Sequence, residues 1–356
     1  MMGLTVVYNR ISHHAGRSGY DKLVDYVALR MAVHRLDHYH PPLVPQSVQT
    51  WLATRPGMEW YDNWSLALEA AVVRRTWDVT SGIYHFLYAE DSYRYLSRVR
   101  PLLRLRRSAV VCSYHQPPEV LDRVVADKRA LTRIDAAIVM SNSQVPFLST
   151  FVPADRVFVV PHGVDTDYYR PGDEARRDPR ICLAVGQWLR DLETLRDVAR
   201  VIARRDPSLR FKIITSEDHR ELFDGLPNVQ FLSGVSDPVL LEAYQTASML
   251  VMPLKDCTAN NTILEALACA LPIITTDIGG IHDYVTPDCS ILAPLRDVDA
   301  MVDAVLQLSD DVSRQRAMSQ AARRRAMDFD WLQIADQQIA VYGKVIGDTP
   351  SYGSRS

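Results

Sequence analysis

Residues Val251–Val285 read VMPLKDCTANNTILEALACALPIITTDIGGIHDYV, and this stretch says most about the fold. The apolar run MLVMP (Met249–Pro253) ends just inside it and has the composition of a buried strand, as does the later run PIITTD (Pro272–Asp277). Between the two runs, Asn260 is a favourable helix N-cap. The residues that follow repeat at helical spacing and predict a buried side made of Ile263, Leu264, Leu267 and Ala268. The order strand, helix, strand predicts one unit of a parallel sheet.

The start of this predicted helix also carries chemistry. Glu265 lies off the predicted apolar side and shares a face with Asn261 and Thr262, four and three residues earlier. A helix N-terminus offers unpaired N–H groups and a positive dipole end to an anion. A carboxylate beside it can accept two hydrogen bonds from a ribose diol. The pattern therefore predicts a site for a nucleotide diphosphate with its sugar.

The stretch LEALACALPIITTDIGGIHDYV (Leu264–Val285) resembles the donor-site motif of the retaining glycosyltransferases of family four. The resemblance implies an α/β protein with the GT-B fold, in which two Rossmann-like doubly wound domains face a central cleft. The family has two glutamates eight positions apart, and the second matches Glu265, which is taken to hold the ribose. The first is associated with the donor sugar and falls at Cys257, with Asp256 next to it, so the chain departs from the family there.

Further donor-site residues follow from the same resemblance. The family has an arginine beside the glycine that matches Gly186 and a lysine shortly after, both aimed at the diphosphate. Here Gln187 takes the adjacent position, so we expect Arg190 to bind the phosphates, with a solvated arginine opening a helix as the alternative. Val235 falls in the loop beside the nucleobase, and the backbone of Gly279 and Gly280 is expected at the diphosphate.

The first half opens with LTVVYN (Leu4–Asn9), a glycine-containing loop and a helix from about Asp21, which is a Rossmann-type opening. In the resembling family this loop lines the cleft, which makes Gly16, Arg17, Ser18 and Gly19 candidate cleft residues. His115 ends the strand SAVVCSYH (Ser108–His115) at the sheet edge where ligands bind. The family has a histidine there, close to the transferred sugar. We expect His115 to bond a sugar hydroxyl or shape the acceptor site, with a histidine satisfied by backbone groups as the alternative.

Strand-like runs separated by helical patterns continue along the chain and predict two parallel-sheet domains. The polar stretch YYRPGDEARRDPR (Tyr168–Arg180) is the predicted linker. We therefore expect an acceptor-binding domain over residues 1–170, a donor-binding domain over 171–329 and a disordered tail over 347–356. A helix over about 330–346 is expected to pack back on the first domain. The other predicted strands are Asp78–Leu87, Asp135–Asn142, Val157–Asp165, Ile181–Gly186, Phe211–Thr215 and Val229–Gly234.

Composition excludes several classes of protein. A chain of 356 residues with 47% hydrophobic and 23% charged residues is ordinary for a globular protein of two domains. A net charge of −3 argues against a nucleic-acid binder. The five cysteines form no Cys-x-x-Cys pair, and no apolar run or leader pattern indicates a membrane span or secretion, so a cytoplasmic enzyme is expected. The six arginines of Ser92–Arg107 are expected to form a solvated or acceptor-binding surface, with contact to the inner membrane surface as the alternative.

The sequence and the resemblance together predict a retaining hexosyltransferase that uses a nucleotide diphosphate sugar as co-substrate, without cofactor or metal. Its acceptor would be a sugar, lipid-linked or small-molecule hydroxyl. Asp165 and Asp167 form an Asp-x-Asp pair, but they belong to the turn before the predicted linker and are not expected to bind a metal. Two alternatives are a non-catalytic sugar-nucleotide-binding module, suggested by Cys257, and a GT-B nucleotide-sugar epimerase.

Overall fold

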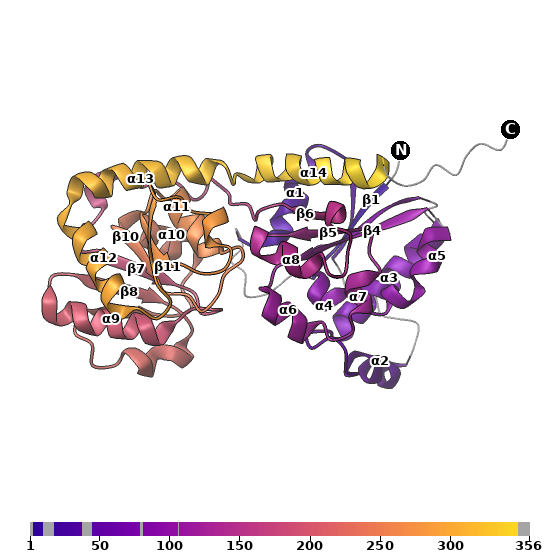
Figure 1. Ribbon diagram of the computed structural model, residues 1–356, viewed down its shortest axis with the longest axis horizontal. Coiled ribbons are helices and arrows are strands. Elements are labelled where there is room, and N and C mark those ends of the chain that lie inside the picture. The colour runs from indigo at the N-terminus through magenta and orange to yellow at the C-terminus, as the bar shows by residue number, and fades with distance from the viewer. Residues whose placement is uncertain (1–2, 10–17, 38–44, 79–80, 106, 348–356) are drawn as a thin grey trace. The chain divides into compact units, whose positions relative to one another are not determined.

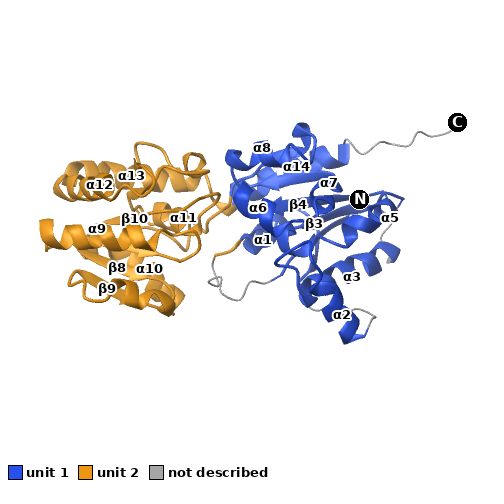
Figure 2. Ribbon diagram, turned by 60° about the horizontal axis from the view of Figure 1, so that its bottom comes forward, with its two compact units in different colours: residues 1–13, 20–161, 332–356 blue, residues 14–19, 162–331 orange. Residues whose placement is uncertain are grey.

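The computed structural model describes residues 3–9, 18–37, 45–78, 81–105 and 107–347. Their contacts divide them into two compact units, drawn in different colours in Figure 2. The first unit contains the described residues before Arg10, residues 20–161 and the chain from Leu332 on; the second contains residues 162–331 with Ser18 and Gly19. Each unit holds one parallel six-stranded sheet with helices packed against it (Figure 1). The prediction of two doubly wound α/β domains is confirmed.

The sheet of the first unit has the strand order β2-β1-β3-β4-β5-β6. Its strands are β1 (Gly3–Val7), β2 (Val33–Leu36), β3 (Gly82–Phe86), β4 (Ser108–Tyr114), β5 (Ala136–Val139) and β6 (Val157–Val159). Its helices are α1 (Leu23–Ala28), α2 (Gln46–Ala53), α3 (Asn63–Asp78), α4 (Ala89–Ser92), α5 (Arg100–Leu105), α6 (Pro118–Val124), α7 (Arg129–Thr132), α8 (Val145–Leu148) and α14 (Trp331–Gly347). The chain first moves from β1 to β2 and then crosses to β3 on the other side, so the strand order reverses between β1 and β3. Such a reversal is where open α/β sheets bind ligands.

Burial explains which strands could be predicted in this unit. Every residue of β3, β4 and β5 is buried, which is why these strands read as continuous apolar runs. The strand β2 lies at the sheet edge and exposes two of its four residues, so its sequence VHRL gave no comparable signal and the strand was not predicted.

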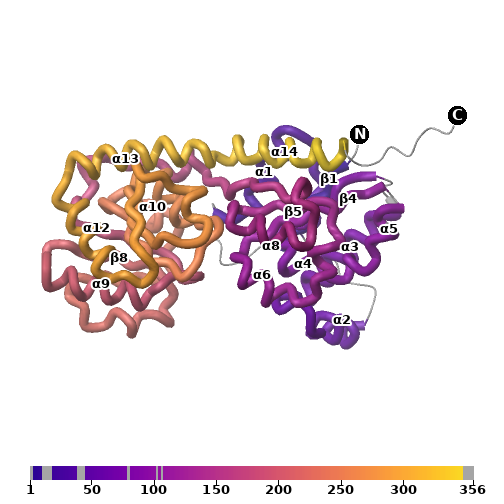
Figure 3. Tube along the Cα trace, viewed as in Figure 1, coloured from indigo at the N-terminus to yellow at the C-terminus, as the bar shows by residue number. Residues whose placement is uncertain are grey.

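The late helix α14 belongs to the first unit although it is nearly the last segment of the chain. It spans Trp331–Gly347, close to the predicted 330–346. The Tyr342 hydroxyl lies 2.7 Å from Nδ1 of His85 in β3, and the Arg30 guanidinium lies 3.1 Å from the Asp336 carboxylate. Figure 3 shows this yellow helix beside the indigo and violet segments of α1 and β1. These side-chain contacts fix the C-terminal helix to the sheet that the N-terminus begins.

The sheet of the second unit has the strand order β12-β11-β10-β7-β8-β9. Its strands are β7 (Ile181–Val185), β8 (Arg210–Ile214), β9 (Val229–Leu232), β10 (Met249–Met252), β11 (Ile273–Thr276) and β12 (Ser290–Ala293). Its helices are α9 (Leu192–Arg205), α10 (Asp237–Thr246), α11 (Asn261–Ala268), α12 (Val298–Asp310) and α13 (Val312–Met327). The order reverses between β7 and β10, as in a Rossmann dinucleotide-binding fold.

Two apolar layers cover the two faces of this second sheet. Leu183 and Leu250 point into a layer with α10, α11 and α13. Their strand neighbours Cys182 and Met249 point into the opposite layer, with α9 and α12. The alternation follows from the two-residue period of a strand. Burial on both faces gives these strands their unbroken apolar sequences.

The predicted strand Val157–Asp165 is longer than the observed one. β6 ends at Val159, after which the chain leaves the first sheet. The backbone N–H of His162 donates to the Tyr284 hydroxyl at 3.1 Å, and Val164 pairs with Asp330, both within the second unit. The two units therefore part after Pro161 in the structure, and Tyr169, ahead of the predicted boundary at residue 170, is buried in the apolar layer of the second unit.

Candidate functional site

The candidate site of the second unit lies at the carboxyl ends of β7 and β10, where its strand order reverses. Gly186 follows β7 directly and has a φ of +90°, a conformation that favours glycine. A Cβ at Gly186 would also lie 3.0 Å from a terminal nitrogen of Arg190. The loop after β10 leads into α11. The fold thus brings Gly186, Arg190 and the start of α11 to one place, although 72 residues of chain separate Arg190 from Thr262.

Arg190 is held in one orientation by protein acceptors. Its Nε donates to the Val185 carbonyl at 3.1 Å and its Nη1 to the Trp188 carbonyl at 3.0 Å. Its Nη2 donates to Asn260 Oδ1 and to the Thr262 hydroxyl, both at 3.1 Å. Within the described part of the chain, no carboxylate lies within ion-pair distance of Arg190. Burial lowers the pKa of Arg190 to about 10, so the group stays a cation at neutral pH and suits an external anion.

The N-terminus of α11 is built as predicted. The Asn260 side chain caps the helix by accepting the Ile263 backbone N–H at 3.3 Å, and the helix begins at Asn261. The same Asn260 oxygen accepts from Arg190, so one side chain joins the helix cap to the cation. A fixed cation beside free helical N–H groups can bind a diphosphate.

Glu265 differs from its predicted placement off the apolar face. The whole of Thr262–Ala268 is buried, and Glu265 is 4% exposed. Its Oε2 accepts the Tyr244 hydroxyl of α10 at 2.8 Å. Burial raises the pKa of Glu265 to about 7, against the lowering effect of nearby hydroxyl groups, of which the Tyr244 hydroxyl has the largest effect. Tyr244 was not foreseen, because a tyrosine 21 residues earlier on another helix gives no local signal.

The loop before α11 packs against the turn after β11. The Gly280 backbone N–H donates to the Cys257 carbonyl at 2.7 Å, so that N–H is used within the protein. Gly279 has a φ of +58°, and a Cβ there would lie 2.3 Å from the Cys257 carbonyl oxygen. Cys257 itself is 3% exposed, its thiol donates to the Thr258 carbonyl, and burial raises its pKa to about 12. The thiol at the position of the family's first glutamate is therefore a neutral, buried group.

The remaining donor-site and loop candidates divide between described and undescribed residues. Val235 lies after β9 on the same carboxyl edge and packs against the apolar layer of α10 and α11. Ser18 groups with the second unit, and its side chain bonds to Glu265. Gly19 has a φ of +115°. Gly16 and Arg17 lie outside the described residues. The roles of all these residues stay predictions.

His115 lies in the first unit, at the carboxyl end of β4. Its ring packs edge-on against Tyr20, with ring centroids 4.7 Å apart, and beside Tyr88 at 4.8 Å. Oε1 of Glu90 lies 3.1 Å from the His115 backbone nitrogen and 3.2 Å from its Nδ1. Glu90 was missed from the sequence; the one available signal is its place just after the buried strand β3.

Asp165 and Asp167 do not form a metal site with other described residues, among which no group of three His, Cys, Asp or Glu side chains could hold an ion. Asp165 instead accepts the Tyr168 backbone N–H at 2.9 Å and closes a turn. Between them, Thr166 donates to Asp330 at 2.5 Å. Asp165 and Thr166 thus have structural contacts in the turn, and the expectation that Asp165 and Asp167 bind no metal stays a prediction.

The arginines of Ser92–Arg107 are not all on the surface, although the whole segment was predicted to be a solvated, acceptor-binding or membrane-contacting surface. Arg94 and Arg100 are buried at 1% and 2% exposed. Arg94 donates to the Pro56 carbonyl, and Arg100 pairs with Asp135. The end of α5 stays on the surface, where Leu105 is 80% exposed.

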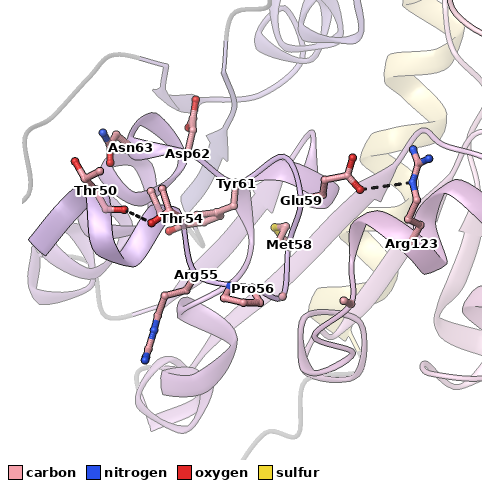
Figure 4. A pocket seen from close by; sticks show the side chains of 13 residues that line it. Thr50, Thr54, Arg55, Pro56, Met58, Glu59, Tyr61, Asp62, Asn63 and Arg123 are labelled. Atoms are coloured by element: carbon pink, nitrogen blue, oxygen red, sulfur yellow. Dashed lines mark hydrogen bonds and ion pairs between the residues drawn. The ribbon is translucent and has the colours of Figure 1, made fainter.

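A pocket of about 560 Å³ in the first unit is separate from every predicted site residue. It lies between α2, the start of α3 and α6 (Figure 4). Two of its charged side chains, Glu59 and Arg123, pair with one another at 3.5 Å. No predicted role attaches to this pocket.

Comparisons with known proteins find similarity to glycosyltransferases. Residues 180–311 match the family described as glycosyl transferases group 1. The chain is 27% identical over 254 residues to a D-inositol 3-phosphate glycosyltransferase of Kribbella flavida, which covers 63% of this chain and 60% of that protein. The chain thus spans less than two thirds of the length of this curated relative.

Two solved structures show the fold. Sucrose-phosphate synthase from Thermosynechococcus elongatus superposes with a TM-score of 0.72 at 17% identity, over 97% of this chain and 99% of that one. HepE from Anabaena, solved in complex with UDP-glucose, superposes with a TM-score of 0.70 at 15% identity, over 96% and 100%. The chain has the GT-B fold, and its second unit is similar to the glycosyl transferases of group 1.

Proposed function

We propose that this chain is a retaining hexosyltransferase that moves a hexose from a nucleotide diphosphate sugar to an acceptor hydroxyl. The observation that carries the proposal is the Arg190 cation, held at the start of α11 without a carboxylate partner among the described residues. The similarity to glycosyltransferases supports the reaction class, and HepE, a protein of the same fold, was solved with UDP-glucose.

Charge stabilisation is the main chemical task of this site. As the bond from the sugar to the diphosphate breaks, negative charge grows on the leaving phosphate oxygens. Arg190 and the first N–H groups of α11 would stabilise that charge without reorganising, because protein acceptors already hold them in place. Glu265 would hold the ribose diol, and Tyr244 would fix its carboxylate. In the retaining reaction the acceptor attacks on the leaving-group face, and a phosphate oxygen takes its proton.

Cys257 is the observation that favours the alternative function, a non-catalytic sugar-nucleotide-binding module. A neutral buried thiol cannot supply the charge of the family's first glutamate. In a working transferase, backbone N–H groups of Thr258–Asn261 and the Asn260 or Asn261 amide would make the contacts to the sugar. A binding module would bind donor through the same groups and turn nothing over.

A thermal-shift screen across UDP-, GDP- and ADP-sugars identifies the donor, because a bound ligand raises the melting temperature. Arg190→Gln should then weaken binding of that donor by roughly tenfold to a hundredfold, as expected for lost charge-assisted bonds. Arg177→Gln is the matched control: Arg177 is another partly buried arginine of the second unit, bonded to the Cys269 and Ala270 carbonyls. Equal effects of the two variants on affinity would contradict the diphosphate role.

Product analysis separates the candidate activities. The protein is incubated with donor and a panel of sugar and lipid-linked acceptors, and the anomeric centre of the product is examined by proton NMR. We expect the product to have the same anomeric configuration as the donor. An inverted product rejects the retaining mechanism. Donor binding with neither transfer nor hydrolysis supports the binding module, and a donor epimer in the absence of acceptor supports the epimerase.

We also propose peripheral contact with the inner membrane surface through the end of α5. Leu105 is 80% exposed and lies beside Arg104, and both residues are well placed for anionic lipid. Among the described helices, none is long and apolar enough to cross a bilayer. Sedimentation with vesicles containing phosphatidylglycerol should carry the protein down, whereas neutral vesicles should not. Equal sedimentation with Leu105→Glu would reject this surface.

A further inference from the structure

The helix α4 after β3 and the residue after β4 hold a pair, the buried Glu90 and the half-buried His115. Glu90 is 3% exposed and stands in the first turn of α4. Its Oε1 accepts the His115 backbone N–H at 3.1 Å and lies 3.2 Å from Nδ1 of the ring. One carboxylate oxygen therefore binds both the backbone and the side chain of the same histidine.

Two tyrosines pack against the ring of His115. Tyr20 meets it edge-on, at a ring angle of 73°, and Tyr88 lies beside it at 34°. The Tyr88 hydroxyl accepts the Tyr20 backbone N–H at 3.1 Å, which links the two. Tyr20 follows the loop after β1, and Tyr88 and Glu90 follow β3. The ring is thus held at the reversal of strand order in the first sheet, where such folds bind ligands.

The carboxylate decides which ring nitrogen carries the proton. An ionised carboxylate only accepts hydrogen bonds, so Nδ1 facing Glu90 is the donor. In a neutral imidazole the other nitrogen, Nε2, is then an acceptor. An acceptor suits a hydroxyl group, which can donate its hydrogen to it. The same orienting arrangement fixes the ring in histidines that bind metals or move protons.

We propose that Glu90 is the positioning residue of His115, holding Nδ1 protonated so that Nε2 accepts a hydrogen bond from a hydroxyl of the sugar substrate. The sugar part of this inference rests on the proposed function. A second observation supports a polar ligand here. The Oε2 atom of Glu90 is buried, and within the described part of the chain it has no hydrogen-bond partner. A buried acceptor without a partner is costly, and a second donor from a polyhydroxyl ligand would satisfy it.

The first experiment reads the tautomer directly. Two-bond ¹H–¹⁵N correlation spectra of the full chain, assigned with His115→Asn, should show the His115 ring with Nδ1 protonated and Nε2 bare. Glu90→Gln should lower the population of the Nδ1-protonated ring, because a neutral amide oxygen at the position of Oε1 is a weaker acceptor than the carboxylate. A wild-type ring with its proton on Nε2 would overturn the proposal, whether or not the variant folds.

Glu69→Gln is the matched control. Glu69 is another glutamate of the first unit that is 3% exposed, and it accepts the backbone N–H groups of Arg94, Tyr95 and Leu96. Loss of its charge should lower stability while leaving the His115 tautomer and the turnover per folded molecule unchanged. A tautomer change in Glu69→Gln as large as in Glu90→Gln would mean that Glu90 has no specific role.

The second experiment tests the sugar. With the donor identified, Glu90→Gln should lower kcat about tenfold or more, as expected for a misplaced catalytic-site group, and leave the donor KM within about twofold. Unchanged kcat with an altered tautomer would reject the role in sugar binding. If no donor is turned over at all, the proposed function fails, while the tautomer measurement still decides the role of Glu90.

Discussion

At the scale of single residues, Glu265 combines a buried position with a functional carboxylate. Burial raises its pKa from 4.5 to about 7, so the folded state holds this proton more tightly than the unfolded state. Stability from this group is therefore greatest below pH 4.5 and is lost as the pH rises to about 7. Above pH 7 the folded protein carries the full cost of a buried charge, which is the form that can hold a diol.

Glu265→Gln should weaken donor binding at pH 8 by about tenfold or more, because charge-assisted bonds to the diol are lost. At pH 8 the free energy of unfolding of the same variant should be roughly 1–3 kcal/mol higher than that of the wild type, since the buried charge is gone. The variant should therefore unfold at a higher denaturant concentration. Wild-type donor affinity should rise between pH 6 and pH 8, whereas the affinity of the variant should be flat. Calorimetry and urea titration measure these effects, and a flat wild-type profile would remove Glu265 from the donor site.

Cys257→Ser should keep more than about half of the wild-type turnover, because a thiol with a raised pKa is a poor nucleophile. Burial raises this pKa to about 12, and the nearby Asp256 raises it further against the lowering effect of Arg190. Mass spectrometry of protein trapped with donor should find no sugar on Cys257. A hexose adduct there would instead indicate a covalent double displacement.

At the scale of elements, α11 depends on a cap that also orients the cation. Asn260→Ala should cost about 1 kcal/mol of stability, as for other N-caps. It should also weaken donor binding, because Arg190 loses its Asn260 acceptor. Asp297→Ala is the matched control, since Asp297 caps α12 by accepting the Ala300 N–H at 2.9 Å. Urea unfolding should show a similar loss of stability for both variants, and donor titration should show a loss of donor affinity for Asn260→Ala alone.

The turn after β11 is fixed by a close approach between two loops. Gly279→Ala should destabilise the protein by about 1–3 kcal/mol more than Gly225→Ala, since an added Cβ would clash with the Cys257 backbone. Both glycines have positive φ, but a Cβ at Gly225 would meet nothing within 4 Å. Because both variants place alanine at a positive φ, the difference between their urea midpoints measures the cost of the clash at Gly279 separately from the cost of backbone strain. Equal midpoints would show that the loops separate freely.

At the scale of the whole molecule, the proposed transfer relies on Arg190 and the N-terminus of α11, and not on a metal ion, to stabilise the leaving diphosphate. Turnover should therefore persist in excess EDTA, with the same kcat as in magnesium. The basis is Arg190 at the α11 N-terminus and the structural use of Asp165 in a turn. Activity that disappears in EDTA and returns with magnesium or manganese would assign a metal role after all.

The sequence by itself determined the features that arise from neighbouring residues. Apolar runs predicted the strands buried on both faces, helical spacing predicted α11 and α14, and Asn260 marked the helix start. The donor-site motif singled out Glu265 by its match to the family's second glutamate. Arg190 was singled out as the basic residue nearest to Gly186, because Gln187 takes the place of the family's arginine. The edge strand β2 was not predicted, since its sequence VHRL has no apolar pattern, whereas the edge strands β6 and β9 were predicted from their apolar residues.

Only the tertiary structure decided what these residues contact. Tyr244 reaches Glu265 across 21 residues, Glu90 reaches His115 across 25, and Arg190 reaches Asn260 across 70. The burial of Arg94 and Arg100 was also decided by the tertiary structure, because the basic sequence of Ser92–Arg107 gave no sign of it. The physical reason is that periodicity and capping depend on a few adjacent residues, whereas partners, burial and pKa depend on which strands become neighbours in the sheet.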